Sequence, residues 1–86
     1  MHIQVRQDHI DRGVCYRPNG CPIALAIQEE LGDTDGSYHV QVLGSYVSID
    51  FMHDWSWRKF ALPQIAEVFI VAFDHKMPVE PFEFDI

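Results

Sequence analysis

The stretch YHVQVLGSYVSIDFMH, residues 38–53, contains two runs in which apolar and polar residues alternate. Such alternation is typical of a β-strand with one buried face. Gly44 and Ser45 separate the runs, and glycine at the first central position favours a tight hairpin turn. The apolar positions of the two runs are Val40, Val42, Val47, Ile49 and Phe51. The stretch therefore predicts two antiparallel strands.

The same alternation predicts three further strands. Residues 2–6 place Ile3 and Val5 between polar neighbours, which is the pattern of a half-buried strand. The segment DWSWRKFALP, residues 54–63, predicts a third strand after the hairpin. The segment PFEFDI, residues 81–86, predicts a closing strand with an acidic outer face.

The first predicted helix begins at Cys21, because Pro22 suits the first helical position, where its missing N–H would be unpaired anyway. Gly32 is suited to end this helix. Before it, residues 7–13 predict a turn or a short helical piece, and after it residues 33–37, DTDGS, predict a polar turn. The apolar face of the helix consists of Ile23, Ala24, Ile27 and Leu31.

The second predicted helix begins at Pro63 and covers residues 64–77, a segment with few polar residues. A helix of this composition is buried on most sides, or one of its apolar faces meets another chain. His75 and Lys76 complement the negative end of its dipole.

This order of elements predicts a single α+β domain over residues 1–86. We expect a two-layer sandwich with an antiparallel or mixed sheet of four to five strands and two helices on one face. The split βαβ or ferredoxin-like arrangement is the topology that this order favours.

The charge of the chain restricts its partners. Thirteen acidic and six basic residues give a formal net charge of −7, which repels a nucleic-acid backbone. We therefore expect no direct binding to DNA or RNA, and we expect a protein partner with a basic surface. No apolar run has the length of a membrane span and the amino terminus lacks the pattern of a signal peptide, so we expect a cytoplasmic protein that does not bind membranes.

Two cysteines flank a Pro-Asn-Gly turn in CYRPNGCP, residues 15–22, and several explanations stay open. Cys21 precedes a helix, whose dipole would favour a reactive thiolate, although a buried helix cap is the simpler interpretation. A disulfide between Cys15 and Cys21 would close a small loop. A metal site would use the two cysteines with a histidine such as His9, but their spacing is wider than in structural zinc sites. We expect no metal and no cofactor.

The segment HDWSW, residues 53–57, places Trp55 and Trp57 beside acidic residues. Paired tryptophans anchor interfaces, but in so short a chain they also serve as core residues, so both interpretations stay open. If the tryptophans form a binding face, four carboxylates would belong to the same face: Asp50, Asp54, Glu83 and Asp85. No phosphate-binding glycine loop, nucleophile elbow or metalloprotease helix is present in the sequence, and we expect no enzyme.

Three segments carry a resemblance to other sequences: HIDRG at residues 9–13, CPIALAI at 21–27 and ALPQIAEVFIVAFDHKMPVEPFEFDI at 61–86. With these segments the chain resembles a group of short open reading frames from bacteriophages, prophages and bacterial genomes. The resemblance implies a phage-linked, cytoplasmic protein and carries over no catalytic residues.

The function that these observations predict is that of a small acidic protein-binding module. On the phage resemblance, it would be an inhibitor of a host defence nuclease complex, similar to an anti-CRISPR protein, that occupies a basic surface used for nucleic acid. The binding residues would be Asp50, Asp54, Trp55, Trp57, Glu83 and Asp85. Two alternatives stay open: a regulatory thiol or metal site at the two cysteines, and a homodimeric assembly domain that uses the apolar second helix.

Overall fold

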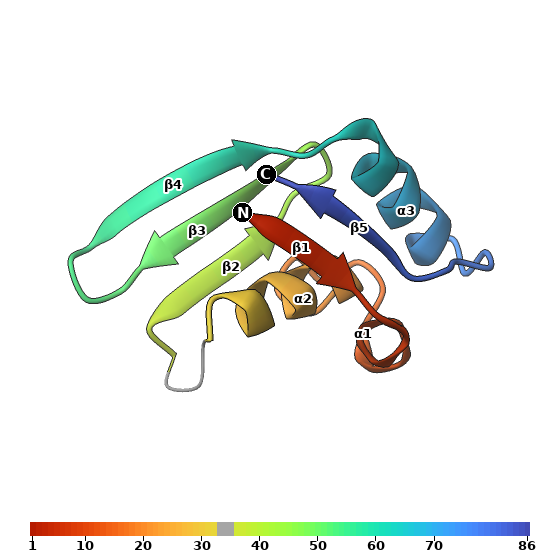
Figure 1. Ribbon diagram of the computed structural model, residues 1–86, viewed down its shortest axis with the longest axis horizontal. Helices are drawn as coiled ribbons and strands as arrows, with labels where there is room; N and C mark the ends of the chain where they lie inside the picture. The colour runs from red at the N-terminus through yellow and green to blue at the C-terminus, as the bar shows by residue number, and fades with distance from the viewer. Residues whose placement is uncertain (33–35) are drawn as a thin grey trace.

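The computed structural model of the protein describes residues 1–32 and 36–86 (Figure 1). Five strands and three helices make up this part of the chain, so the predicted α+β class is confirmed. Most of the polar turn predicted at residues 33–37 lies outside the described residues. In chain order the elements are β1 (His2–Val5), α1 (Gln7–Arg12), α2 (Pro22–Glu30), β2 (Tyr38–Val42), β3 (Tyr46–Phe51), β4 (Ser56–Ala61), α3 (Gln64–Asp74) and β5 (Phe82–Asp85).

The strands are divided between two sheets, and the ends of the chain meet in one of them. β1 pairs with β5, and β2, β3 and β4 form a three-stranded sheet in that order. The amino group of Met1 donates a hydrogen bond to the carbonyl oxygen of Ile86 at 2.6 Å. Every ladder among residues 1–32 and 36–86 is antiparallel. A split βαβ or ferredoxin-like sheet would instead pair the first strand in parallel with a later one, so the two-sheet arrangement differs from that topology.

The hairpin of β2 and β3 has the register that its sequence predicts. Val40 lies opposite Ile49 and Val42 opposite Val47, so the apolar side chains share the buried face. At the turn Gly44 has a φ of +80°, a conformation that glycine adopts without strain. The turn is tight, because the Ser45 N–H donates to the Leu43 carbonyl oxygen at 2.9 Å.

Helix α2 lies at the centre of the core. Cys21 is its N-cap and Pro22 its first residue, as predicted. Ile23 and Ile27 have no exposed surface, and the helix packs against α1, β1 and β2. In Figure 1 it lies beneath both sheets. One helix therefore covers strands of both sheets, and the remaining core residues lie around it: Ile3, Val5, Val40, Val42, Val47, Ile49, Leu62, Ala66, Phe69 and Phe84.

The predicted third strand of the hairpin is present as β4, but it lies outside this core. Phe60 is half-buried and the other residues of β4 are exposed. Figure 1 shows β4 at the edge of its sheet, on the side away from α2. The pairing with β3 is therefore the main contact that holds this strand. No helix in the described residues is both long and apolar enough to cross a membrane.

Substitution of Ile27 by alanine should lower the free energy of unfolding by about 2–5 kcal/mol, because it leaves a cavity in the centre of the core. Urea unfolding followed by circular dichroism measures this change. The matched control is Ile65→Ala at an exposed position of α3, for which we expect a change within about 0.5 kcal/mol. Equal effects of the two substitutions would contradict the central position of α2.

Candidate functional site

Trp55 lies in the turn between β3 and β4, Trp57 is the second residue of β4, and both are exposed to solvent. Their exposed fractions are 82% and 64%, so the interpretation of these tryptophans as core residues is wrong. The core does not include them because no helix covers this end of β4. Trp55 also has a φ of +60°, which is unusual for a large side chain and is found at turns and ligand sites.

A cavity of about 180 Å³ lies between these aromatic side chains. Its lining includes Trp55, Trp57, Met52 and Asp50. Asp50 pairs directly with Trp57 across β3 and β4, so the two side chains share the sheet face that points away from the core residue Ile49. The cavity therefore combines indole rings, a thioether and a carboxylate.

Asp54 fixes the conformation of the same turn. Its Oδ1 accepts hydrogen bonds from the Ser56 hydroxyl at 2.6 Å and from the Ser56 N–H at 3.0 Å. The hydrogen bond from the Ser56 hydroxyl lowers the pKa of Asp54, so this carboxylate stays charged near neutral pH. Four of the six predicted binding residues thus lie together at the β3–β4 turn.

The other two predicted binding residues, Glu83 and Asp85, lie on β5 in the second sheet. In Figure 1 the β3–β4 turn and β5 occupy opposite halves of the molecule. The His2 ring contacts both carboxylates, with Nδ1 at 2.8 Å from Asp85 and Nε2 at 3.5 Å from Glu83. The hydrogen bond to Asp85 raises the pKa of His2. These two carboxylates join the paired ends of the chain and are separate from the turn.

Both cysteines are free thiols, so the disulfide is absent. The Sγ of Cys15 donates to the Phe73 carbonyl oxygen at 3.3 Å, which ties the loop before α2 to the end of α3. Cys21 is buried, and burial raises the pKa of its thiol despite the backbone N–H groups at the start of α2. The backbone N–H groups favour the thiolate, but burial outweighs them, so the prediction of Cys21 as a buried helix cap is confirmed. Within residues 1–32 and 36–86, no group of His, Cys, Asp and Glu side chains is arranged to hold a metal.

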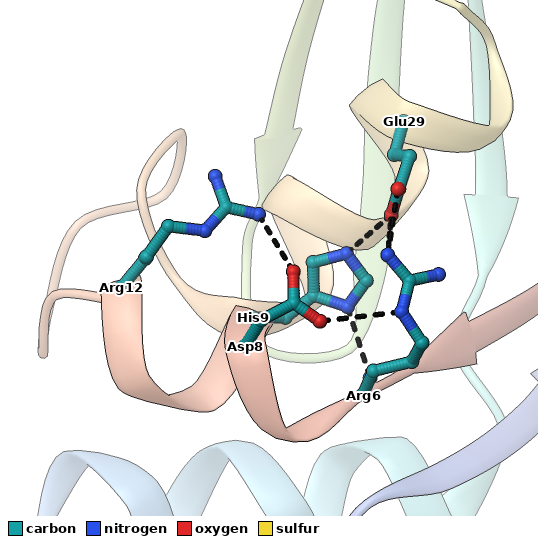
Figure 2. Close-up of polar contacts among 5 residues, drawn as sticks. All are labelled: Arg6, Asp8, His9, Arg12 and Glu29. Carbon is teal, nitrogen blue, oxygen red and sulfur yellow. Dashed lines mark hydrogen bonds and ion pairs between the residues drawn. The ribbon is translucent and has the colours of Figure 1, made fainter.

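His9 is fully buried and joins α1 to α2 (Figure 2). Its Nδ1 accepts the backbone N–H of Arg6 at 2.9 Å, and its Nε2 lies 2.5 Å from a carboxylate oxygen of Glu29. The Arg6 guanidinium also contacts Glu29, at 2.6 and 2.7 Å. Because Nδ1 accepts a hydrogen bond, Nε2 carries the proton and donates it to Glu29. Both ring nitrogens are thus engaged, and the ring serves as a cap for α1 in the way that Glu or Gln does in a capping box.

The sequence alone did not reveal this role of His9. The sequence predicts His9 only as a candidate metal ligand beside Cys15 and Cys21, because its contact with Glu29 joins residues that are 20 positions apart. The spacing of charged residues in α1 gives a local indication, since Asp8 and Arg12 form an ion pair at 3.1 Å one helical turn apart (Figure 2). No local pattern indicates that the His9 ring itself is buried.

Helix α3 leaves an apolar strip exposed. Ala66 and Phe69 face the core, so the helix is not buried on most sides. More than half of the surface of each of four neighbouring apolar residues is exposed: Ile65, Val68, Val71 and Met77. Self-association through this helix, the homodimeric alternative, stays a prediction.

Comparison of the chain with protein-family models, with curated proteins and with solved structures gives no match.

The substitution His9→Ala should lower the free energy of unfolding by at least about 2 kcal/mol, because it leaves the Arg6 N–H unpaired and opens a cavity. Thermal and urea unfolding measure this loss. The control is His53→Ala at an exposed position, with an expected change within about 0.5 kcal/mol. If the two variants were equally stable, His9 would not be the link between α1 and α2.

The lowered pKa of Glu29 affects how the free energy of unfolding changes as the pH falls. The hydrogen bond from Arg6, followed by that from His9, lowers the pKa of Glu29 in the folded protein. A carboxylate with a lowered pKa contributes stability above its unfolded pKa and loses that contribution as the pH falls through the folded value. Between about pH 6 and pH 3, the unfolding free energy of Glu29→Gln should therefore fall less steeply than that of the unsubstituted protein. Parallel pH profiles from urea unfolding would contradict this role.

Proposed function

We propose that this protein is a protein-binding module that docks through the β3–β4 turn onto a basic surface of its partner. The observation that carries the proposal is the exposure of Trp55 and Trp57, which line a cavity together with Asp50, the residue paired with Trp57. Tryptophan is enriched among the residues that dominate binding energy at protein interfaces. Here neither indole contributes to the core, so a role in folding does not account for them.

The chemistry of the cavity favours a cationic side chain as the group that enters it. Indole rings attract an ammonium or guanidinium group through their π faces, and the Asp50 carboxylate would pair with the same charge. Asp54, held charged by Ser56, adds a second negative group at the turn. The formal net charge of −7 would attract a basic surface at longer range.

The charge of the cavity and of the whole chain also indicates what kind of protein the partner is. A basic groove that otherwise holds nucleic acid has the required charge, and the resemblance to phage reading frames favours a groove in a host defence nuclease complex. In that case the β3–β4 turn would occupy the groove and block access of the nucleic acid. Binding to a basic surface does not by itself inhibit the partner; inhibition also requires that the bound surface is the groove that holds nucleic acid.

The experiment is a titration of a dye-labelled octa-arginine peptide, used as a model of a basic surface, with fluorescence anisotropy as the readout. Trp57→Ala should raise Kd at least about tenfold, which corresponds to about 1.4 kcal/mol of binding energy. Asp50→Asn should also weaken binding, because it removes the charge beside the indole.

The matched control is Asp85→Asn, which makes the same chemical change on the other sheet. We expect this variant to change Kd by less than about threefold, since Asp85 lies on β5 and its charge acts on the β3–β4 turn only at long range. Equal effects of Asp50→Asn and Asp85→Asn, together with unchanged binding by Trp57→Ala, would show attraction by net charge alone and would overturn the proposal.

A further inference from the structure

A second cavity, of about 250 Å³, lies at the other end of the β2–β3 hairpin from the tryptophans. It is formed where the loop before α2, the β2–β3 turn and the end of α3 meet. Its apolar lining includes Val42, Leu43 and Ile70, and its charged lining consists of Arg17 and Asp74. Apolar walls with a few convergent polar groups are typical of small-molecule sites.

Tyr16 lines this cavity in a strained conformation. Its φ is +61°, which is unfavourable for a large side chain, and 70% of its surface is exposed. Among the described residues three non-glycine residues have positive φ, and two of them, Tyr16 and Trp55, line cavities. Asp74 holds the conformation, because its Oδ1 accepts the Tyr16 N–H at 3.0 Å. Strain of this kind is concentrated at ligand sites.

The loop that carries Tyr16 is anchored at two further points. The Cys15 thiol donates to the Phe73 carbonyl oxygen at 3.3 Å, and the Val42 N–H donates to the Pro18 carbonyl oxygen at 2.8 Å. These bonds fix the loop to α3 on one side and to β2 on the other. The walls of the cavity are thus held by hydrogen bonds between elements that are distant in the sequence.

The two charged residues of the cavity do not neutralise each other. Within residues 1–32 and 36–86, Arg17 makes no ion pair, although it lines the same cavity as Asp74. The Tyr16 N–H donates to one oxygen of Asp74, and the other oxygen has no hydrogen-bond partner within the same residues. A basic and an acidic residue therefore line the same cavity as the apolar residues, and no ion pair joins them among the described residues.

We propose that this cavity binds a small zwitterion with an apolar side chain, of which a free apolar α-amino acid is the simplest example. The carboxylate of the ligand would pair with the Arg17 guanidinium, and its ammonium group with the free oxygen of Asp74. The side chain of the ligand would cover Val42, Leu43 and Ile70, with the Tyr16 ring at the edge of the cavity. This site is separate from the β3–β4 turn and does not depend on the function proposed for that turn.

The test is a titration of the full chain with L-leucine, followed by ¹H–¹⁵N correlation spectra. We expect saturable shifts of the amide signals of Tyr16 and Gly44, which lie at the cavity. Leucinamide lacks the carboxylate and 4-methylpentanoate lacks the ammonium group, so each should bind at least about tenfold more weakly than leucine. Absence of saturable shifts, or equal binding of all three compounds, overturns the proposal.

Substitutions of Arg17 and Asp74 test whether these two residues bind the charged groups of the ligand. Arg17→Gln and Asp74→Asn should each weaken leucine binding at least about tenfold, and Asn at position 74 still accepts the Tyr16 N–H, so the loop is retained. Arg58→Gln, on exposed β4, is the matched control and should leave binding unchanged. Equal effects of Arg17→Gln and Arg58→Gln would overturn the role of Arg17.

Discussion

The burial of α2 determines how the other elements of the protein are arranged. The chain has 86 residues, so it has few apolar side chains with which to form a core. Ile23 and Ile27 contribute two of its largest fully buried side chains, from a helix of nine residues that packs against strands of both sheets. Because this one helix covers β1 and β2, it leaves β4 uncovered at the far edge of the second sheet (Figure 1). The tryptophans are therefore exposed because α2 packs against β1 and β2 and not against β4.

The polar contacts hold the short elements onto this core. α1 has only six residues, too few to be stable alone, and the buried His9 fixes it to α2 through Glu29. The loop before α2 is held in a similar way, by the bond from the Tyr16 N–H to Asp74. In both cases an ionisable side chain holds a neighbouring segment in place through a hydrogen bond. In the described part of the chain, the surfaces that remain free for partners include the β3–β4 turn, the apolar strip of α3 and the cavity beside Arg17.

The sequence predicted the elements better than their arrangement. Alternation at Val40 and Val42, and Pro22 at a helix start, are local features, so the strands and helices could be predicted from neighbouring residues. Pairing of β1 with β5 joins residues about 80 positions apart, for which the sequence carries no local pattern. The exposure of Trp57 could not be predicted either, because alternation identifies the faces of a strand but not whether a helix covers one. At Cys21 the sequence indicated the dipole of α2, whereas the deciding factor, burial, depends on the whole fold.

Quenching of tryptophan fluorescence by acrylamide measures whether α2 leaves the end of β4 uncovered and the indole rings of Trp55 and Trp57 free to bind. Trp55 and Trp57 are the two tryptophans of the chain, so the signal reports on this turn alone. Acrylamide is neutral, and the negative charge of the protein does not repel it. We predict that the quenching constant of the folded protein is close to that of the protein unfolded in urea. Strong protection of the folded protein from acrylamide would show that the indoles are covered, and would contradict both the uncovered β4 and the binding function proposed for it.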